Sequence, residues 1–222
     1  ERLAALGGAV SKISHDLRNI LTTTQILADR LEMSDDPKVT KMAPKLLNSL
    51  SRGINLCERT LTFGKADEPE PEIHSVNLKE IVDDVIENDA LLKTDDKVQL
   101  ISTIANDMQI SADPEQMFRV LTNLIRNAGQ AIEGTGKPGI VNISADAIAD
   151  GVNIIVRDSG PGLPEKAREF LFQPFHGGAR RGGTGLGLAI AAELVRGHGG
   201  NLVLIETSEA GTSFRIYLPD PK

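Results

Sequence analysis

The sequence predicts an α+β protein in which an N-terminal helical hairpin, dimerising into a four-helix bundle, precedes an α/β two-layer sandwich. In the first part, apolar residues recur at alternating spacings of three and four, which is typical of amphipathic helices. A short acidic stretch with Pro69 and Pro71 follows. Beyond it, helical patterns are mixed with short strand patterns, which indicates a layered α/β domain. We therefore expect a hairpin over residues 1–66, a linker over 67–76 and an α/β domain over 77–222.

The first helix is expected over residues 1–33 and carries a heptad stripe of apolar side chains. Its members are Leu3, Leu6, Val10, Ile13, Leu17, Ile20, Leu27 and Leu31. His15 lies on the side of the helix away from this stripe, and Asn19 follows one turn later on the same face. The pattern leaves two interpretations open: His15 is an ordinary exposed polar residue, or it is a nucleophile that another domain must reach.

The second helix is expected after a turn at 34–37 and reaches about Phe63. Its apolar residues form two adjacent rows, made up of Leu46, Leu47, Leu50, Ile54, Leu56, Cys57 and Leu61. Two rows require two packing neighbours, and a single hairpin provides only one. We therefore expect two copies of the hairpin to form a four-helix bundle, which makes a homodimer the expected state.

The α/β domain is expected to place its helices on one face of a mixed sheet. Its N-terminal helix begins after Asn77, and a longer helix follows the N-cap Asp113. The expected helices are 77–93, 114–132, 164–171 and 185–197, and the expected strands are 98–104, 108–111, 139–147, 152–157, 201–206 and 213–218.

Composition and charge restrict the class of protein. The 222-residue chain is 40% hydrophobic with a formal net charge of −7, and no stretch is apolar enough to span a membrane. Residues 67–222 carry 14 basic and 24 acidic side chains, which argues against nucleic acid as a partner. The single cysteine, Cys57, fits a reducing cytoplasm, which is the expected location of this part of the protein. Because the chain opens within a helix, we expect a longer protein, membrane-anchored or not, and any sensory part would lie upstream of this chain.

Two asparagines on the helix that starts at Pro114 suggest a metal site. Asn123 and Asn127 are four residues apart and share one helix face, while apolar residues such as Leu124 and Ala128 form the buried side. Amide oxygens can help to hold Mg²⁺, which keeps several waters and takes phosphate oxygens as further ligands. Asparagine on an exposed face also commonly binds only water, so the pair by itself fits both interpretations.

Two glycine-containing stretches indicate a nucleotide. In residues 158–162, Asp-Ser-Gly-Pro-Gly follows a strand pattern, so a flat ring could approach the backbone while the carboxylate accepts a hydrogen bond from an adenine amino group. Residues 182–190 lead from a glycine-rich loop into a helix, whose N-terminal N–H groups can bind phosphates. Nine of the 21 glycines lie between Gly177 and Gly200, so we expect a mobile lid there. Each stretch alone also fits an ordinary turn or loop.

Together and in order, six motifs resemble the H, N, G1, F, G2 and G3 boxes of two-component sensor histidine kinases. They are His-Asp-x-x-Asn at 15–19, Asn-x-x-x-Asn at 123–127, Asp-x-Gly-x-Gly at 158–162, Phe-Gln-Pro-Phe at 172–175, Gly-x-Gly-x-Gly at 183–187 and Gly-Thr at 211–212. The resemblance covers nearly the whole chain. It implies that the hairpin is a dimerisation and histidine-phosphotransfer domain, followed by an ATP-binding domain of the histidine-kinase ATPase type.

The resemblance also implies residue roles. His15 would accept the γ-phosphoryl group of ATP, Asp16 would orient the imidazole, and the Asn19 amide would orient a water when phosphate is removed from a partner. Asn127, with Asn123, would hold Mg²⁺. The residues implied in nucleotide binding are Asn123, Asn127, Gln130, Asp158, Gly160, Gly162, Phe175, Arg180, Gly183, Thr184, Gly185, Leu186, Gly187, Leu188 and Thr212. The implied partners are a second copy of the chain and the receiver domain of a response regulator.

Gln130 departs from the commonest family pattern, because many members have a lysine there that meets the phosphates. Arg126, Arg180 or Arg181 could supply this charge. The departure keeps open an alternative, a kinase-inactive scaffold or phosphatase of a two-component system. An ATP-hydrolysing clamp with the same nucleotide fold is disfavoured, since such relatives carry a water-activating glutamate where this chain has Asn123 and lack the histidine helix.

Overall fold

The computed structural model describes the helical residues Thr24, Val39 and Ala43 and the ranges 69–88, 97–174 and 185–220. The chain divides into two compact units, of which Glu70–Gly177 with Gly187–Lys222 is the one described almost throughout. Apart from those three single residues, the expected helical hairpin lies outside the described residues.

This unit consists of short strands and helices that alternate along the chain. Its elements are β1 (His74–Asn77), α3 (Leu78–Asn88), β2 (Val98–Ser102), β3 (Gln109–Ala112), α4 (Pro114–Glu133), β4 (Gly139–Ile148), β5 (Gly151–Asp158), α5 (Glu165–Arg168), α6 (Gly187–Gly197), β6 (Asn201–Ser208) and β7 (Gly211–Pro219).

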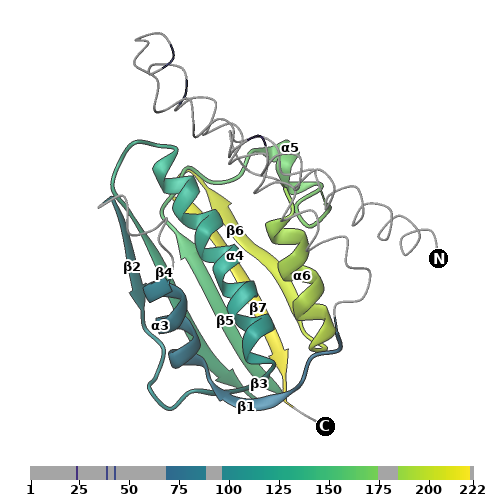
Figure 1. Ribbon diagram of the computed structural model, residues 1–222. Coiled ribbons are helices and arrows are strands. Elements are labelled where there is room, and N and C mark those ends of the chain that lie inside the picture. Colours follow the sequence, from purple (N-terminus) through teal and green to yellow (C-terminus); the bar gives the residue numbers. More distant parts are fainter. Residues whose placement is uncertain are drawn as a thin grey trace, which may run out of the picture. The chain divides into compact units, whose positions relative to one another are not determined.

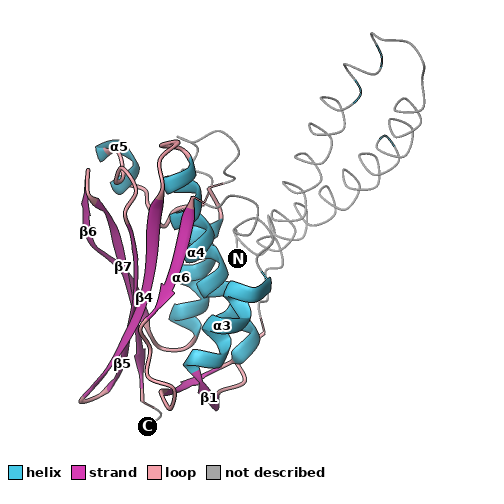
Figure 2. Cartoon of the chain, turned by 90° about the vertical axis from the view of Figure 1, so that its left-hand side faces the viewer, coloured by secondary structure: helices cyan, strands magenta, loops and turns pink. Residues whose placement is uncertain are grey.

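The main sheet has five strands in the order β2-β4-β5-β7-β6, and β1 and β3 form a small second sheet. β2 runs parallel to β4, and all other neighbours in the main sheet are antiparallel. Helices α3, α4 and α6 cover one face of this sheet (Figure 1), and the side view shows all three on the same side of the strands (Figure 2). The expected two-layer arrangement with a mixed sheet is confirmed.

Strand alternation explains which face is covered. In β5, the side chains of Val152, Ile154 and Val156 are buried, and so is that of Asp158. Arg157, which lies between Val156 and Asp158, is exposed. The covered face thus receives every second side chain and packs against the apolar side of α4. Members of this core include Leu78, Val82, Met117, Leu121, Leu124, Ile125, Ile143, Ile154, Val195 and Ile216.

Two helices begin at side-chain caps that the sequence predicts. The Asp113 carboxylate accepts a hydrogen bond of 3.0 Å from the Gln116 N–H, and Pro114 is the first residue of α4. The Asn77 side-chain oxygen accepts one of 2.9 Å from the Lys79 N–H at the start of α3. These caps satisfy N–H groups that have no partner within the helix.

Two local features differ from expectation. The last residues of the expected linker, 67–76, belong to strand β1, which pairs with β3. Pro69 and Pro71 precede this strand, so its N–H groups remain available for pairing. The helix expected over 164–171 is only the four-residue α5, which begins without a side-chain cap. A helix of one turn gains few internal hydrogen bonds.

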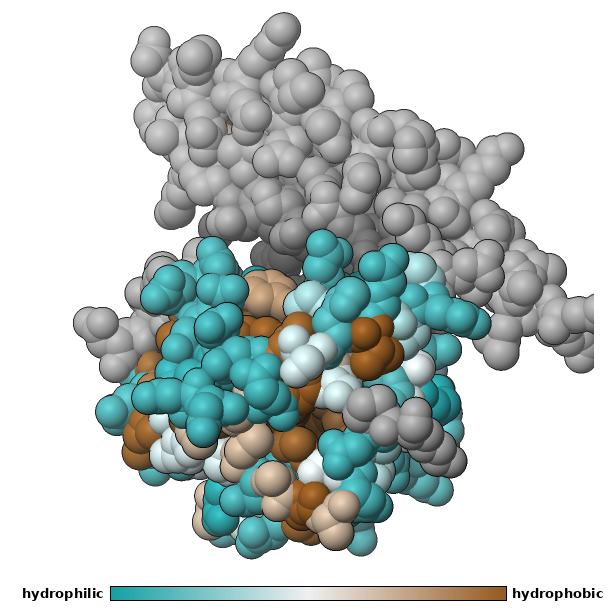
Figure 3. Space-filling model, turned by 90° about the horizontal axis from the view of Figure 1, so that it is seen from below, coloured by the Kyte–Doolittle hydropathy of each residue, from teal (hydrophilic) through white to brown (hydrophobic). Residues whose placement is uncertain are grey.

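The surface of this unit is mixed. Seen from below, hydrophobic residues form small patches separated by hydrophilic ones (Figure 3). Among the residues that the structure describes, no helix combines the length and the apolar character needed to cross a membrane.

Candidate functional site

One row of polar side chains on α4 lies at the edge of its buried side. Asn123 and Asn127 are half-buried, and Gln130 is exposed. The next apolar residues, Leu124 and Ala128, are buried against the sheet, as expected. The two amide side chains therefore share one helix face at a partly shielded position, where they are accessible to a ligand.

The start of α6 lies against this row. A Cβ atom built on Gly187 would be 3.3 Å from the side-chain oxygen Oδ1 of Asn123 and 3.7 Å from its Cγ atom. Glycine at the first position of α6 thus allows close contact between the two helices. Before α6, Gly185 has a positive φ of 69°. The side chain of the next residue, Leu186, is fully buried. Leu188 is half-buried in the first turn of α6.

Asp158, the last residue of β5, is buried with an exposed fraction of 5%. Its Oδ1 atom accepts a hydrogen bond of 2.7 Å from the Gly160 N–H. A Cβ on Gly160 would be 2.8 Å from this same oxygen and 3.1 Å from the Cβ atom of Ala131 on α4. Because Ala131 is one turn beyond Asn127, the Asp158 loop and the polar row of α4 are close together.

Thr212 on β7 lies beside Asp158 at the end of β5, and together with Thr207 on β6 these residues form a row across three neighbouring strands. Its Cα atom is paired with that of Asp158 on β5 and with that of Thr207 on β6. The hydroxyl oxygens of Thr212 and Thr207 are 3.4 Å apart. The Thr207 hydroxyl also accepts a hydrogen bond of 2.8 Å from the Leu163 N–H. These residues point to the helix-covered face, since paired residues in antiparallel strands share a face.

Gly162 lets the loop fold back over this row. It has a φ of 75°, and a Cβ atom built on it would be 2.2 Å from the Ser208 carbonyl oxygen. The loop of residues 159–164 is therefore fixed at one end by Asp158 and at the other by Thr207. We did not predict a role for Thr207. The expected strand 201–206 ends just before Thr207, and the expected strand 213–218 begins just after Thr212, so their pairing was not foreseen.

The structure brings together Asn123, Asn127, Asp158, Gly160, Gly162, Gly187 and Thr212 at one end of the helix-covered face. Gln130, on the same helix face as Asn123 and Asn127, is exposed. Seven further predicted site residues lie outside the described residues, namely His15, Asp16, Asn19, Phe175, Arg180, Gly183 and Thr184. Phe172, the first residue of the Phe-Gln-Pro-Phe motif, packs edge-to-face on Phe214 with ring centroids 6.4 Å apart.

The helix that carries the asparagines has an electrostatically favourable start. Burial raises the pKa of the Asp113 carboxyl, but hydrogen bonds from the backbone N–H groups of Gln116, Glu72 and Glu115 outweigh it, so the pKa lies below its ordinary value. The N-cap is therefore ionised at neutral pH, where a negative charge favours the N-terminus of α4.

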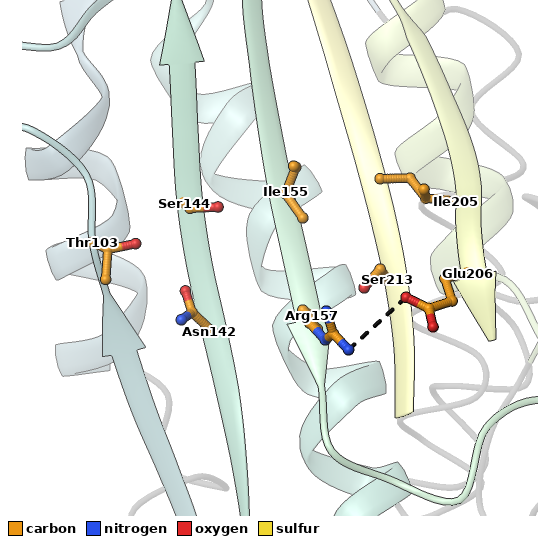
Figure 4. A pocket seen from close by; sticks show the side chains of 8 residues that line it. All are labelled: Thr103, Asn142, Ser144, Ile155, Arg157, Ile205, Glu206 and Ser213. Atoms are coloured by element: carbon orange, nitrogen blue, oxygen red, sulfur yellow. Dashed lines mark ion pairs between the residues drawn. The ribbon is translucent and has the colours of Figure 1, made fainter. Parts of the chain in front are cut away.

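A shallow pocket of about 420 Å³ lies on the opposite face of the sheet (Figure 4). Arg157 and Glu206 form an ion pair of 3.9 Å across its rim, and both are exposed, so the pair adds little stability. The remaining lining residues are Thr103, Asn142, Ser144, Ile155, Ile205 and Ser213. Since Arg157 and Ser213 alternate with Asp158 and Thr212 along their strands, this pocket is separate from the candidate site.

Comparisons with known proteins agree with this geometry. Residues 112–222 match the family described as histidine kinase-, DNA gyrase B- and HSP90-like ATPase, and residues 5–69 match the His Kinase A (phospho-acceptor) domain. The chain is 32% identical to the sensor histidine kinase ZraS of Escherichia coli O157:H7 over 231 residues, which covers 99% of this chain and 47% of that protein. It is 31% identical to the sensory histidine kinase/phosphatase NtrB of Salmonella typhimurium, covering 95% of this chain and 61% of that protein.

Among solved structures, the chain is similar to histidine kinase ThkA in complex with the response regulator protein TrrA. The TM-score is 0.67 at 29% identity, covering 100% of this chain and 64% of that one. The chain spans about half the length of curated relatives such as ZraS. With both domain matches and the site geometry in agreement, the chain belongs to the two-component sensor histidine kinases, which are ATP-dependent protein-histidine kinases, and it contains their phospho-acceptor and ATP-binding parts.

Proposed function

We propose that this chain, acting as a homodimer, transfers the γ-phosphoryl group of Mg-ATP to His15 and then passes it to an aspartate on the receiver domain of a response regulator. One observation carries the proposal: the ATPase-family match, which includes Asn127, Asp158 and Thr212, belongs to the same chain as a phospho-acceptor match that includes His15. The solved complex of ThkA with a response regulator supports the choice of partner.

In the proposed reaction, a neutral ring nitrogen of His15 attacks the γ-phosphorus. A nitrogen–phosphorus bond forms while the bond to the β–γ bridging oxygen breaks, and ADP leaves with that oxygen. Asp16 would accept a hydrogen bond from the other ring nitrogen and so fix the tautomer. In the second step, a carboxylate oxygen of the receiver aspartate takes the phosphoryl group, and the imidazole is regenerated.

The side-chain amide oxygens of Asn123 and Asn127 on α4 are ligands of the kind that Mg²⁺ takes. Among the described residues, no three His, Cys, Asp or Glu side chains cluster in a way that could hold a metal ion. Asn127 and Asn123 would contribute neutral oxygens, so these residues would hold the ion only together with phosphate oxygens and water. When bound, Mg²⁺ would offset the charge that develops on the transferring phosphoryl group.

Calorimetry tests this metal role. Asn127→Ala should lose the part of the ADP affinity that depends on Mg²⁺. The control Asn142→Ala, on the uncovered face of the sheet, should keep it. An Asn127→Ala protein that responds to Mg²⁺ as the unmodified chain does would remove Asn127 from the metal site.

The decisive test of the kinase is incubation of the purified chain with γ-labelled ATP and Mg²⁺, beside His15→Gln. The expected label is acid-labile and alkali-stable, it is absent from His15→Gln, and it moves to a receiver domain added afterwards. Label on His15→Gln would show that another residue is the nucleophile. An unlabelled chain that still binds ATP would favour the kinase-inactive scaffold or phosphatase.

We also propose that the chain removes phosphate from its partner. The similarity to NtrB, whose name gives both activities, supports this second activity. Asn19 would orient the attacking water from the same helix face as His15. Asn19→Ala should keep autophosphorylation and slow the decay of the phosphorylated receiver domain. An unchanged decay rate would contradict this role.

A further inference from the structure

We infer that Thr207, on β6, is a positioning residue that makes the adenine pocket selective for adenine over guanine. The inference rests on the proposed function, because it takes Asp158 and Thr212 as the residues that meet the base. Thr207 would not touch the nucleotide. It would act through the hydrogen-bond direction of the Thr212 hydroxyl and through the loop of residues 159–164.

The hydroxyl groups in the row have few partners. The Thr207 hydroxyl accepts from the Leu163 N–H at 2.8 Å and lies 3.4 Å from the Thr212 hydroxyl. Within the described part of the chain, the Thr212 hydroxyl has no hydrogen-bond partner besides Thr207. Thr212 is 4% exposed, so its hydroxyl proton is donated either to Thr207 or to a ligand bound beside it.

A hydroxyl group has one proton to donate, so the ligand decides whether every proton in the row is used. If the ligand offers an acceptor, Leu163 donates to Thr207, Thr207 donates to Thr212, and Thr212 donates to the ligand. If the ligand offers a donor, Thr212 accepts from it and donates to Thr207. Thr207 then accepts two hydrogen bonds, and its own proton has no acceptor among the described residues.

The row therefore favours a ligand acceptor next to Thr212. Asp158, paired with Thr212 on the neighbouring strand, can only accept when ionised. Adenine presents an amino donor beside the acceptor N1. This pattern matches Asp158 as the acceptor and Thr212 as the donor. Guanine presents the acceptor O6 beside the donor N1–H, which is the reverse pattern. Thr207 strengthens this discrimination because it supplies the proton that fixes Thr212 as a donor.

Thr207 has a second effect on the same pocket, because it holds the Leu163 end of the loop. The Asp158 carboxylate holds the other end through the Gly160 N–H at 2.7 Å. Loss of the loop anchor alone would weaken the binding of every nucleotide by the same factor. Loss of the donor to Thr212 would change the ratio between adenine and guanine nucleotides, which separates the two effects.

The test measures the dissociation constants of ADP and GDP by calorimetry for the whole chain and for Thr207→Val, Thr207→Ser and the control Thr103→Val, which lies on the uncovered face. Thr207→Val should bind ADP about tenfold more weakly and lose most of its preference for ADP over GDP, as expected for one lost hydrogen bond in a partly buried row. Thr207→Ser and Thr103→Val should behave like the unmodified chain.

Equal weakening of ADP and GDP in Thr207→Val, or no change in either, would overturn the inference. A second measurement needs no variant: the unmodified chain should bind 1-deaza-ADP, which lacks the N1 acceptor, about tenfold more weakly than ADP. Equal binding of these two ligands would also overturn it. If the unmodified chain showed no preference for ADP over GDP, the assignment of Asp158 and Thr212 to adenine would fail as well, whereas transfer of label to His15 would still be judged separately.

Discussion

The ring nitrogen Nε2 of His198, directly after α6, accepts a hydrogen bond of 3.0 Å from the backbone N–H of Asp113, the N-cap of α4. The other ring nitrogen, Nδ1, lies 2.8 Å from the Leu194 carbonyl oxygen, so Nδ1 carries the proton. This buried imidazole joins the end of α6 to the start of the helix that carries Asn123 and Asn127.

His198→Ala should lower the free energy of unfolding by about 2 kcal/mol, because it leaves the Asp113 N–H and the Leu194 carbonyl without this partner. The chain has one tyrosine, Tyr217 on β7, and no tryptophan, so tyrosine fluorescence during urea unfolding reports on this unit alone. The control His74→Ala removes a side chain that is 63% exposed, and it should change the free energy of unfolding by less than about 0.5 kcal/mol. If His198→Ala and His74→Ala lowered the free energy of unfolding equally, His198 would not stabilise the fold by joining α6 to α4.

The Asp113 N-cap predicts a pH-dependent stability. Its pKa in the folded chain lies below the unfolded value of about 3.9, so the ionised cap stabilises the fold above about pH 4. That contribution is lost as the pH falls through the folded-state pKa. Asp113→Ala should cost about 1 kcal/mol near neutral pH, and its deficit should shrink below about pH 4.

Asp113→Asn separates capping from titration, because asparagine caps helices nearly as well but carries no charge. Its deficit near neutral pH should be smaller than that of Asp113→Ala. A deficit of Asp113→Ala that stays the same from neutral pH to about pH 3 would show that the carboxylate does not contribute as an ion.

Gly162 and Gly136 form a matched pair for the loop over the nucleotide site. Both have positive φ, 75° and 70°, so alanine is strained at each by about 1 kcal/mol. A Cβ on Gly162 would be 2.2 Å from the Ser208 carbonyl oxygen, whereas one on Gly136 would have nothing within 4 Å. Gly162→Ala should therefore weaken ADP binding at least about tenfold, a loss of about 1.4 kcal/mol, and Gly136→Ala should leave it unchanged. Similar affinities of the two variants would show that the loop position does not control the pocket.

Gly187→Ala should separate stability from metal-nucleotide binding. The added Cβ would be 3.3 Å from Asn123 Oδ1, so the amide must shift by a few tenths of an ångström. Mg-ADP affinity should fall about two- to tenfold, while the free energy of unfolding should stay equal or rise by up to about 1 kcal/mol, because alanine favours a helix. Gly197→Ala, at the other end of α6, has only Pro71 Cδ at 3.9 Å and should leave the affinity unchanged. A drop in stability without a drop in affinity would contradict this role of Gly187.

Local signals in the sequence determined much of the second unit. The cap Asp113 with Pro114 defines the start of α4, and the apolar spacing through Leu121, Leu124 and Ala128 defines its buried side and hence the face that carries Asn123. The strand alternation before Asp158 identified β5. These signals depend on residues only a few positions apart, and for that reason they could be interpreted without the fold.

The tertiary structure decided what depends on distant residues. β1 became a strand because β3 offers it a partner, and no local pattern in the proline-containing segment signals that pairing. The row of Asp158, Thr212 and Thr207 exists because β7 lies between β5 and β6 and fixes their register. Likewise, His198 acquires its partner from the start of α4, 85 residues away in the sequence. The sequence by itself determined which elements form and which residue types carry the chemistry, whereas hydrogen bonds between elements far apart in the chain depend on packing that only the folded chain provides.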